Sequence, residues 1–244
     1  MKPFLMLQLR PDDYDASGEL AAVMKYGNLK DEDILAVRME KEGVKNINLD
    51  DYSGVIMGGG PSNVSDAHEQ KTEEQKRFEA DLVPILNEII EKDIPFMGIC
   101  YGLNILATYL NGEVSKEKFT ENVGGVDLML TDESKGDPLT KGLPTQFRAF
   151  VGHKEACQDL PKDCVLLASS KTCPVQMIRH KKNIYACQFH PELDVEGIIV
   201  RINIHKFNGY FPPEEANPLI EEVKKEKIVH PHAIMERFIK LYAK

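Results

Sequence analysis

Residues 94–112 read Ile-Pro-Phe-Met-Gly-Ile-Cys-Tyr-Gly-Leu-Asn-Ile-Leu-Ala-Thr-Tyr-Leu-Asn-Gly, with a glycine-flanked cysteine between two apolar runs. The first run predicts a buried strand, and the second predicts a helix that ends at the Asn-Gly pair. A side chain at such a strand-to-helix turn sits in strained backbone, and the flanking glycines relieve the crowding. Cys100 would lie at a helix N-terminus, where the dipole favours the thiolate. This stretch therefore predicts an α/β fold that presents Cys100 as a nucleophile.

A second motif, Gln188-Phe189-His190-Pro191-Glu192, ends a later β-like run. His190 can accept a thiol proton, and Glu192 can hold the imidazole in the required tautomer. A lone cysteine is more often a buried structural residue. The combination of Cys100 with His190 and Glu192 favours catalysis over that interpretation.

The order of apolar runs predicts a flavodoxin-like, doubly wound α/β fold. β-like runs at residues 4–9, 34–37 and 54–57 alternate with helical patterns, and residues 73–92 place apolar side chains on one helical face. Pro84 is expected to interrupt that helix. Alternation of this length predicts a mostly parallel sheet with the active site at the carboxyl ends of its strands.

The pattern changes near residue 124 to closely spaced β-like runs, which predict an antiparallel β extension of the sheet. These runs lie at residues 126–130, 146–151, 165–168, 175–179 and 184–189. The extension is expected to return His190 to the sheet edge beside Cys100. Apolar stripes near the C-terminus predict helices. We therefore expect one domain at residues 1–200, with a C-terminal helical extension, residues 201–244, packed on the same domain.

The motifs around Cys100 and His190 resemble the signatures of class I, triad-type glutamine amidotransferases. A glycine-rich segment, residues 54–64, is similar to the oxyanion strand of the GMP synthase branch of that family. Residues 168–170 and 173–174 also resemble that branch. The resemblance covers about residues 50–195, with the motifs in the family's order. It implies the family's fold and an enzyme that needs no cofactor.

The resemblance implies that Cys100 attacks the side-chain amide carbon of glutamine, with His190 as base and Glu192 as its orienting carboxylate. Hydrolysis of the glutamyl thioester would release glutamate and ammonia. The implied oxyanion hole consists of backbone N–H groups at Gly59, Gly60 and Tyr101, and such donors contribute about 3–4 kcal/mol each in the transition state. The implied substrate-binding residues are Gly58, Asn104, His153, Gln188 and Phe189, with His153 as a pocket wall and not a base.

Asn104 stands where the family usually has glutamine, and asparagine reaches one methylene less. The substrate is therefore glutamine or another γ-glutamyl amide. No phosphate-binding loop of an ATP-pyrophosphatase follows Glu192, so the ammonia would need a separate synthetase or acceptor subunit. The alternatives are a stand-alone hydrolase of γ-glutamyl amides or peptides, and a non-catalytic binding module of the same fold. A cysteine peptidase or deglycase would not be expected to carry residues 188–192.

Composition sets further limits on partners and compartment. The 244 residues carry a net charge of −9, which argues against nucleic acid and anionic membranes as partners. No apolar run reaches the ~20 residues of a membrane span and no signal peptide is evident, so a cytoplasmic location is expected. Five cysteines without C-x-x-C spacing suit reduced thiols. No metal site is expected, although residues 230–232 hold two histidines, and the oligomeric state stays open.

Overall fold

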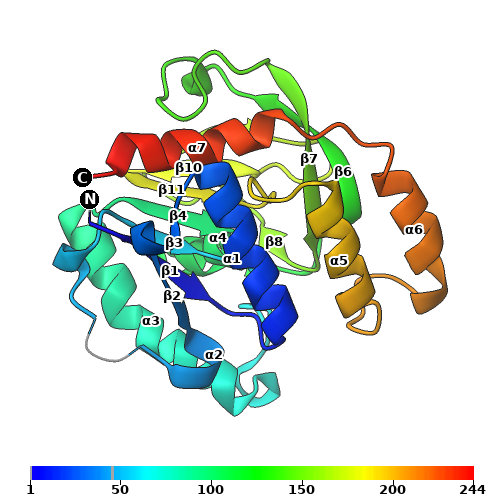
Figure 1. Ribbon diagram of the computed structural model, residues 1–244, viewed down its shortest axis with the longest axis horizontal. Coiled ribbons are helices and arrows are strands. Elements are labelled where there is room, and N and C mark those ends of the chain that lie inside the picture. Colours follow the sequence, from blue (N-terminus) through cyan, green and yellow to red (C-terminus); the bar gives the residue numbers. More distant parts are fainter. Residues whose placement is uncertain (1, 45–46) are drawn as a thin grey trace.

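A nine-stranded mixed sheet forms the centre of the computed structural model, which describes residues 2–44 and 47–244 (Figure 1). Its strand order is β2-β1-β3-β4-β11-β10-β9-β6-β7, and β5 pairs with β8 in a separate ribbon. The strands are β1 (Phe4–Gln8), β2 (Ile34–Arg38), β3 (Val55–Met57), β4 (Phe96–Ile99), β5 (Val114–Ser115), β6 (Glu121–Leu130), β7 (Gln146–His153), β8 (Ala156–Cys157), β9 (Cys164–Ser169), β10 (Met177–His180) and β11 (Ile184–Cys187).

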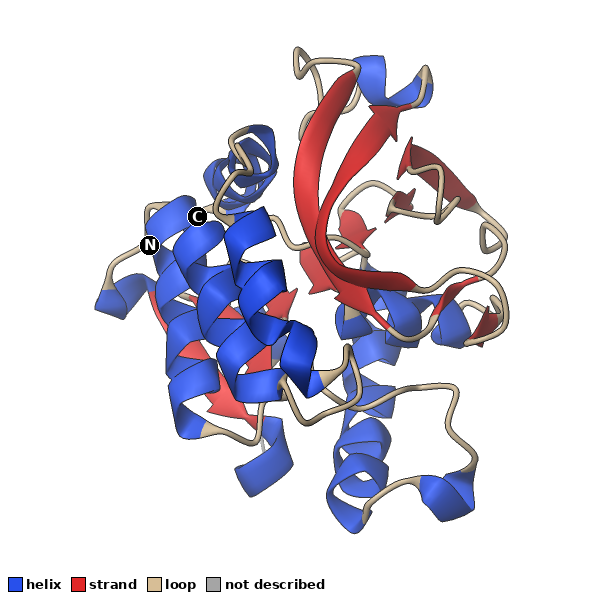
Figure 2. Ribbon diagram, turned by 90° about the vertical axis from the view of Figure 1, so that its right-hand side faces the viewer, coloured by secondary structure: helices blue, strands red, loops and turns tan. Residues whose placement is uncertain are grey.

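Strands β2, β1, β3, β4 and β11 run parallel, which confirms the mostly parallel sheet. Strands β10, β9, β6 and β7 form the predicted antiparallel extension, and Figure 2 shows the long curved pair β6–β7 standing to one side of the helices. The run that precedes His190 is β11, which lies beside β4 in the middle of the sheet. All four residues of β11 are buried, as expected for a strand covered on both faces.

The helices cover both faces of the sheet (Figure 1). They are α1 (Asp13–Gly27), α2 (Met39–Glu42), α3 (Glu73–Lys92), α4 (Tyr101–Tyr109), α5 (Val195–His205), α6 (Ala216–Val223) and α7 (His230–Tyr242). Alternate residues of β1 face opposite ways. Phe4 packs in the core that includes Phe238 of α7, while Leu5 packs in the core that includes Leu82 of α3. A third core joins α5 and α6 to β7 through Phe150.

Helix α3 runs through Pro84 without ending there, so the proline does not divide it into two helices. The helix begins after Thr72, whose side chain accepts the N–H of Gln75 at 3.1 Å. Pro84 is exposed, so the carbonyl that loses its helical partner can be hydrated. Burial of Leu82 and Leu86 on the opposite face holds the helix together across the proline.

The two ends of the chain lie side by side (Figure 1), and the Lys2 N–H donates to the carbonyl oxygen of Lys244 at 2.9 Å. The ring of Phe238 in α7 lies 6.1 Å from that of Phe4 in β1. Helix α7 is thus part of the layer that covers the sheet. Among the helices described here, none is both long and apolar enough to cross a membrane.

Candidate active site

Cys100 occupies a sharp turn between the end of β4 and the start of α4. Its backbone has φ 54° and ψ −100°, a conformation that is strained for a residue with a side chain. A Cβ atom on Gly98 would lie 2.6 Å from the carbonyl oxygen of Gly102, and one on Gly102 would lie 2.9 Å from that of Met57. Both glycines are therefore required by the close approach of neighbouring backbone, as the sequence predicted.

His190 reaches Cys100 because β11 runs parallel to β4. The Cys100 N–H donates to the carbonyl oxygen of Cys187 at 2.7 Å, and residues 188–192 continue from the same end of the sheet. The His190 N–H donates to the carbonyl oxygen of Phe150 at 2.9 Å. The imidazole Nδ1 lies 2.8 Å from Oε1 of Glu192, which is completely buried. The structure thus brings the three predicted catalytic residues to one site.

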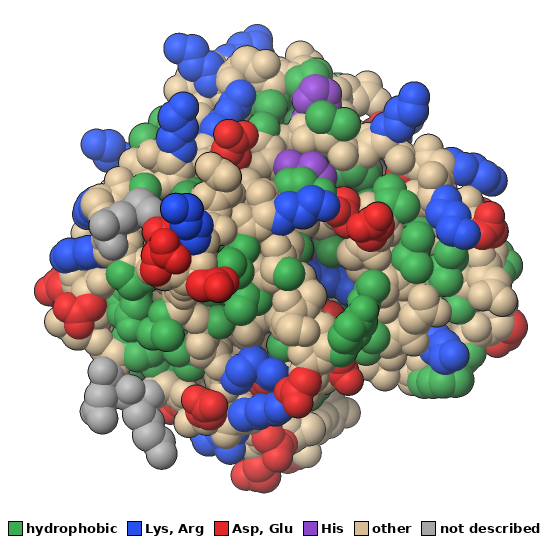
Figure 3. Space-filling view, in the orientation of Figure 1, with side chains coloured by type: hydrophobic (Ala, Val, Ile, Leu, Met, Phe, Trp, Pro, Cys, Tyr) green, Lys and Arg blue, Asp and Glu red, His purple; other side chains and the backbone are tan. Residues whose placement is uncertain are grey.

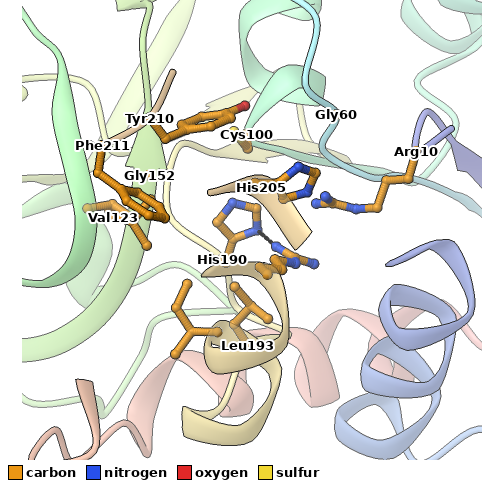
Figure 4. Close-up of a pocket in the computed structure, with 13 residues that line it drawn as sticks. Arg10, Gly60, Cys100, Val123, Gly152, His190, Leu193, His205, Tyr210 and Phe211 are labelled. Atoms are coloured by element: carbon orange, nitrogen blue, oxygen red, sulfur yellow. Dashed lines mark hydrogen bonds between the residues drawn. The ribbon is translucent and has the colours of Figure 1, made fainter. Parts of the chain in front are cut away.

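Cys100 and His190 line one cavity of about 50 Å³ (Figure 4). In the described part of the chain, no hydrogen bond joins the sulfur to the imidazole; Gln188 Nε2 lies 3.8 Å from the sulfur. Catalytic hydrogen bonds are often long before substrate binds. The wall also includes Arg10, Gly60, Arg201, His205, Tyr210 and Phe211. In Figure 4 the Tyr210 hydroxyl points toward Cys100.

Burial favours the neutral forms of both the Cys100 thiol and the His190 imidazole. Burial raises the pKa of Cys100 to about 11, against the attraction of Arg10 and Arg201 for the thiolate. The helix dipole at the start of α4 favours the Cys100 thiolate, whereas loss of hydration favours the thiol. Burial and Arg201 lower the pKa of His190 below 6.5, and Glu192 only partly opposes them. A proton must thus pass from sulfur to imidazole during the reaction.

A buried charge network lies behind the cavity, and the sequence did not reveal it. Arg10 Nε donates to Glu19 Oε1 at 2.7 Å, and its Nη1 donates to Asp15 Oδ2 at 2.9 Å. His205 Nε2 lies 2.8 Å from the same Asp15 oxygen. Burial disfavours the Asp15 carboxylate, but His205 and Arg10 hold the pKa of that carboxyl well below its usual range. The one signal in the sequence for this network was Arg10, a charged residue directly after the mostly apolar run at residues 4–9.

The N–H groups of the glycine loop after β3, residues 58–60, are not equally available to the site. The Gly59 N–H donates to Glu19 Oε1 at 3.2 Å, so it is already engaged. Gly60 lines the cavity, and Tyr101 is the first residue of α4, where N–H groups lack intrahelical partners. A Cβ on Gly58 would lie 2.6 Å from the Glu19 carboxylate. This geometry supports Gly60 and Tyr101 as oxyanion donors more than Gly59.

Asn104 and His153 belong to the protein's own hydrogen-bond network and do not line the cavity. Asn104 Nδ2 donates to Glu155 Oε1 at 3.2 Å. The His153 ring contacts the Glu155 carbonyl oxygen at 2.9 Å and Glu121 Oε2 at 2.8 Å. Gly152 stands at the cavity wall beside His153. Among the other predicted binding residues, Gln188 contacts the Cys100 sulfur and Phe189 is fully buried.

Glu121, His153 and Cys173 bring potential metal-ligand atoms within 4.8 Å of one another. The carboxylate of Glu121 already accepts hydrogen bonds from His153, Gln176 and Ser170. Burial opposes the Glu121 carboxylate, but hydrogen bonds from His153, Thr172 and Ser170 lower its pKa. The cluster therefore has a structural explanation: it joins β6 and β7 to the loop after β9.

Comparison with known proteins gives a consistent result. A family model described as glutamine amidotransferase class-I matches residues 22–197. The chain is 34% identical over 154 residues to a GMP synthase [glutamine-hydrolyzing] of Thermosipho africanus, which covers 63% of this chain and 26% of that protein. It is 32% identical over 143 residues to a GMP synthase [glutamine-hydrolyzing] subunit of Pyrococcus abyssi, which covers 58% of this chain and 66% of that one. The match thus spans less than two thirds of each relative.

Solved structures share the fold across nearly the whole chain. A glutamine amidotransferase of Thermotoga maritima superimposes with a TM-score of 0.76 at 20% identity and covers 98% of this chain and 99% of its own. A putative GMP synthase subunit of Thermoplasma acidophilum gives 0.66 at 21% identity, with 100% and 95% covered. At this identity the two structures support the α/β architecture.

Proposed function

The chain belongs to the class I glutamine amidotransferase family, and we propose that it hydrolyses the side-chain amide of glutamine through a thioester on Cys100. One observation carries the proposal: a strained cysteine and a carboxylate-bound histidine line the same cavity at the carboxyl ends of β4 and β11. Nucleophile, base and orienting group are the components that acyl transfer requires.

In the first half-reaction the Cys100 sulfur attacks the amide carbon, and its proton passes to His190 Nε2. The N–H groups of Gly60 and Tyr101 stabilise the negative oxygen of the tetrahedral intermediate. His190 then donates the proton to the departing nitrogen, the C–N bond breaks, and ammonia leaves. Glu192 stabilises the transient imidazolium.

In the second half-reaction water attacks the thioester carbon while His190 accepts a proton from it. The C–S bond then breaks, and the proton returns to the sulfur. Glutamine and water have become glutamate and ammonia, and the enzyme is restored. The low pKa of His190 suits this cycle, because a weakly basic imidazole releases its proton readily to each leaving group.

Two aromatic side chains of the cavity wall favour glutamine over γ-glutamyl amides with bulky leaving groups. Tyr210 and Phe211 line the same cavity as Cys100 and His190, where they leave less room than smaller side chains would. Asn104, the departure that suggested a different amide, is held by Glu155 away from the cavity. The alternative of a stand-alone hydrolase of larger amides therefore loses its main support.

We further propose that the ammonia passes to a separate synthetase subunit. The similarity to proteins named as single subunits of GMP synthase supports this assignment. All five cysteines are free thiols, which supports a reducing compartment such as the cytoplasm.

The proposal is tested by measuring glutamate release from glutamine, γ-glutamyl methylamide and γ-glutamyl p-nitroanilide with the purified protein. We expect hydrolysis of glutamine and a preference for it over the two substituted amides. The same assay with added cell extract shows whether a partner accelerates the reaction. Absence of hydrolysis under both conditions would contradict the proposal, and a preference for the anilide would support the alternative hydrolase.

Replacing Tyr210 with alanine is expected to widen the cavity toward larger leaving groups. The kcat/KM for γ-glutamyl p-nitroanilide relative to glutamine should rise about 10-fold, in line with the effect of small steric changes in substrate pockets. Phe207→Ala is the matched control, because Phe207 is 74% exposed on the same segment. An unchanged ratio in Tyr210→Ala would show that Tyr210 does not limit substrate size.

A further inference from the structure

Arg201 of α5 contacts both His190 and Glu192. Its Nη1 lies 2.9 Å from His190 Nδ1, and its Nη2 donates to Glu192 Oε1 at 2.9 Å. The side chain is buried, with 8% of the residue exposed. Arg201 also lies beyond residues 22–197, the part of the chain that the family model matches.

These contacts present His190 Nδ1 with two incompatible partners. The nitrogen carries either a proton or a lone pair in the ring plane. With a proton it donates to Glu192, and Nε2 is free to accept the Cys100 proton. With a lone pair it accepts from Arg201, and the proton sits on Nε2. In that tautomer the imidazole cannot act as a base toward the thiol.

We propose that Arg201 is a positioning residue that sets the tautomer of His190, an inference that rests on the proposed role of His190 as base. In the arrangement observed, the Arg201 guanidinium and the Glu192 carboxylate both lie within hydrogen-bond distance of Nδ1. In the proposed resting site the guanidinium donates to Nδ1, and the proton of His190 is on Nε2. When the guanidinium moves away from Nδ1, His190 can take the Nδ1–H tautomer and accept the Cys100 proton at Nε2. Arg201 is therefore a brake on the resting site as well as a partner of Glu192.

Two further carboxylates allow the Arg201 guanidinium to move away from Nδ1 without leaving its buried positive charge unpaired. Arg201 Nε lies 3.9 Å from Asp15 Oδ1, and its Nη2 lies 3.8 Å from Glu19 Oε1. Both carboxylates belong to α1 and are buried. A small displacement toward α1 would exchange the His190 contact for closer ion pairs, and the guanidinium would remain compensated throughout.

The pH dependence follows from the groups that face His190. Burial lowers its pKa, and the charges of Arg201 and Arg10 lower it further, whereas Glu192 raises it. In the described part of the chain, the other polar or charged groups around the site include Asp15, Glu19, Cys100, Gln188, His205 and Tyr210. Because the base must be neutral, activity is lost as pH falls through the pKa of His190. Removing the Arg201 charge should therefore raise that pKa and move the acid limb to higher pH.

The test uses Arg201→Met in the full chain, labelled with 15N at histidine. The 15N shifts of an imidazole distinguish its two neutral tautomers, and His190→Gln assigns the His190 signals. We expect the Nε2–H tautomer in the wild type and the Nδ1–H tautomer in Arg201→Met. The pKa of His190 should rise by about 1 in the variant, and the acid limb of kcat/KM should move by the same amount.

Two further variants separate this role from a structural one. Arg201→Lys restores a cation and should return the acid limb toward its wild-type position. Arg237→Met removes a cation of α7 that binds the carbonyl oxygens of Leu139 and Lys141, and it should leave His190 unchanged. The other histidine signals report whether each variant is folded.

The same tautomer and pKa in wild type and Arg201→Met would overturn the inference. This outcome differs from a failure of the proposed function, because the NMR measurement needs no turnover. A protein that hydrolyses no amide but shows the tautomer change would support the role of Arg201 and contradict the reaction.

Discussion

Replacing Cys100 with alanine should abolish ammonia release from glutamine, with a loss in kcat of about 10⁴-fold or more. Without the sulfur no thioester can form, and the remaining groups would have to activate water directly. A coupled assay that measures glutamate and ammonia separately checks the result. Cys100→Ser is the closer steric match, and it should also fall to near background because a hydroxyl is far harder to deprotonate than a thiol.

Cys157→Ala provides the matched control for the nucleophile. Cys157 is a buried free thiol in β8, and its sulfur contacts the carbonyl oxygen of Asp159 outside the cavity. We expect wild-type activity from this variant. Full activity in Cys100→Ala, or selective loss in Cys157→Ala, would contradict the assignment of the nucleophile.

Replacing Glu192 with glutamine should reduce kcat by about 10³-fold or more while KM changes little. The carboxylate lies 2.8 Å from His190 Nδ1 and compensates the imidazolium that forms when the thiol is deprotonated. The amide has no charge, and its NH₂ group can donate to Nδ1 and so keep the inactive tautomer even when Arg201 moves away from Nδ1. Steady-state kinetics with glutamine, fitted separately for kcat and KM, measures the effect.

Glu196→Gln is the control for this substitution, because Glu196 is exposed in the first turn of α5. It should leave kcat unchanged. A Glu192→Gln enzyme with wild-type kcat would show that His190 needs no anionic partner, which the proposed mechanism does not allow.

The sequence predicted the local parts of the site well because their causes are local. Gly98 is required by the backbone of Gly102 within the same turn, so the motif itself carried that information, whereas Gly102 is required by the carbonyl oxygen of Met57 in β3. His190 and Glu192 are two residues apart, and their contact likewise follows from the short segment. The alternation of strand and helix patterns was sufficient for the parallel sheet.

The features that the sequence did not predict depend on contacts between distant segments. Arg10 lies in the loop after β1, Arg201 in α5 and Tyr210 in the loop after α5. All three line the cavity with Cys100, and no spacing rule connects them. The central position of β11 follows from burial on both faces, which a four-residue apolar run does not distinguish from an edge. The protonation of the Cys100 thiol likewise depends on distant segments, because they bury the sulfur and thereby raise its pKa to about 11.

The central claim is that Cys100 forms a covalent bond to the γ-acyl group of glutamine. Treatment of the wild-type protein with a glutamine analogue that carries a diazoketone in place of the amide, followed by peptide mass spectrometry, tests it directly. We predict one adduct, on Cys100, together with loss of glutaminase activity and protection by excess glutamine. An adduct on Cys157, Cys164, Cys173 or Cys187 with Cys100 unmodified would contradict the account.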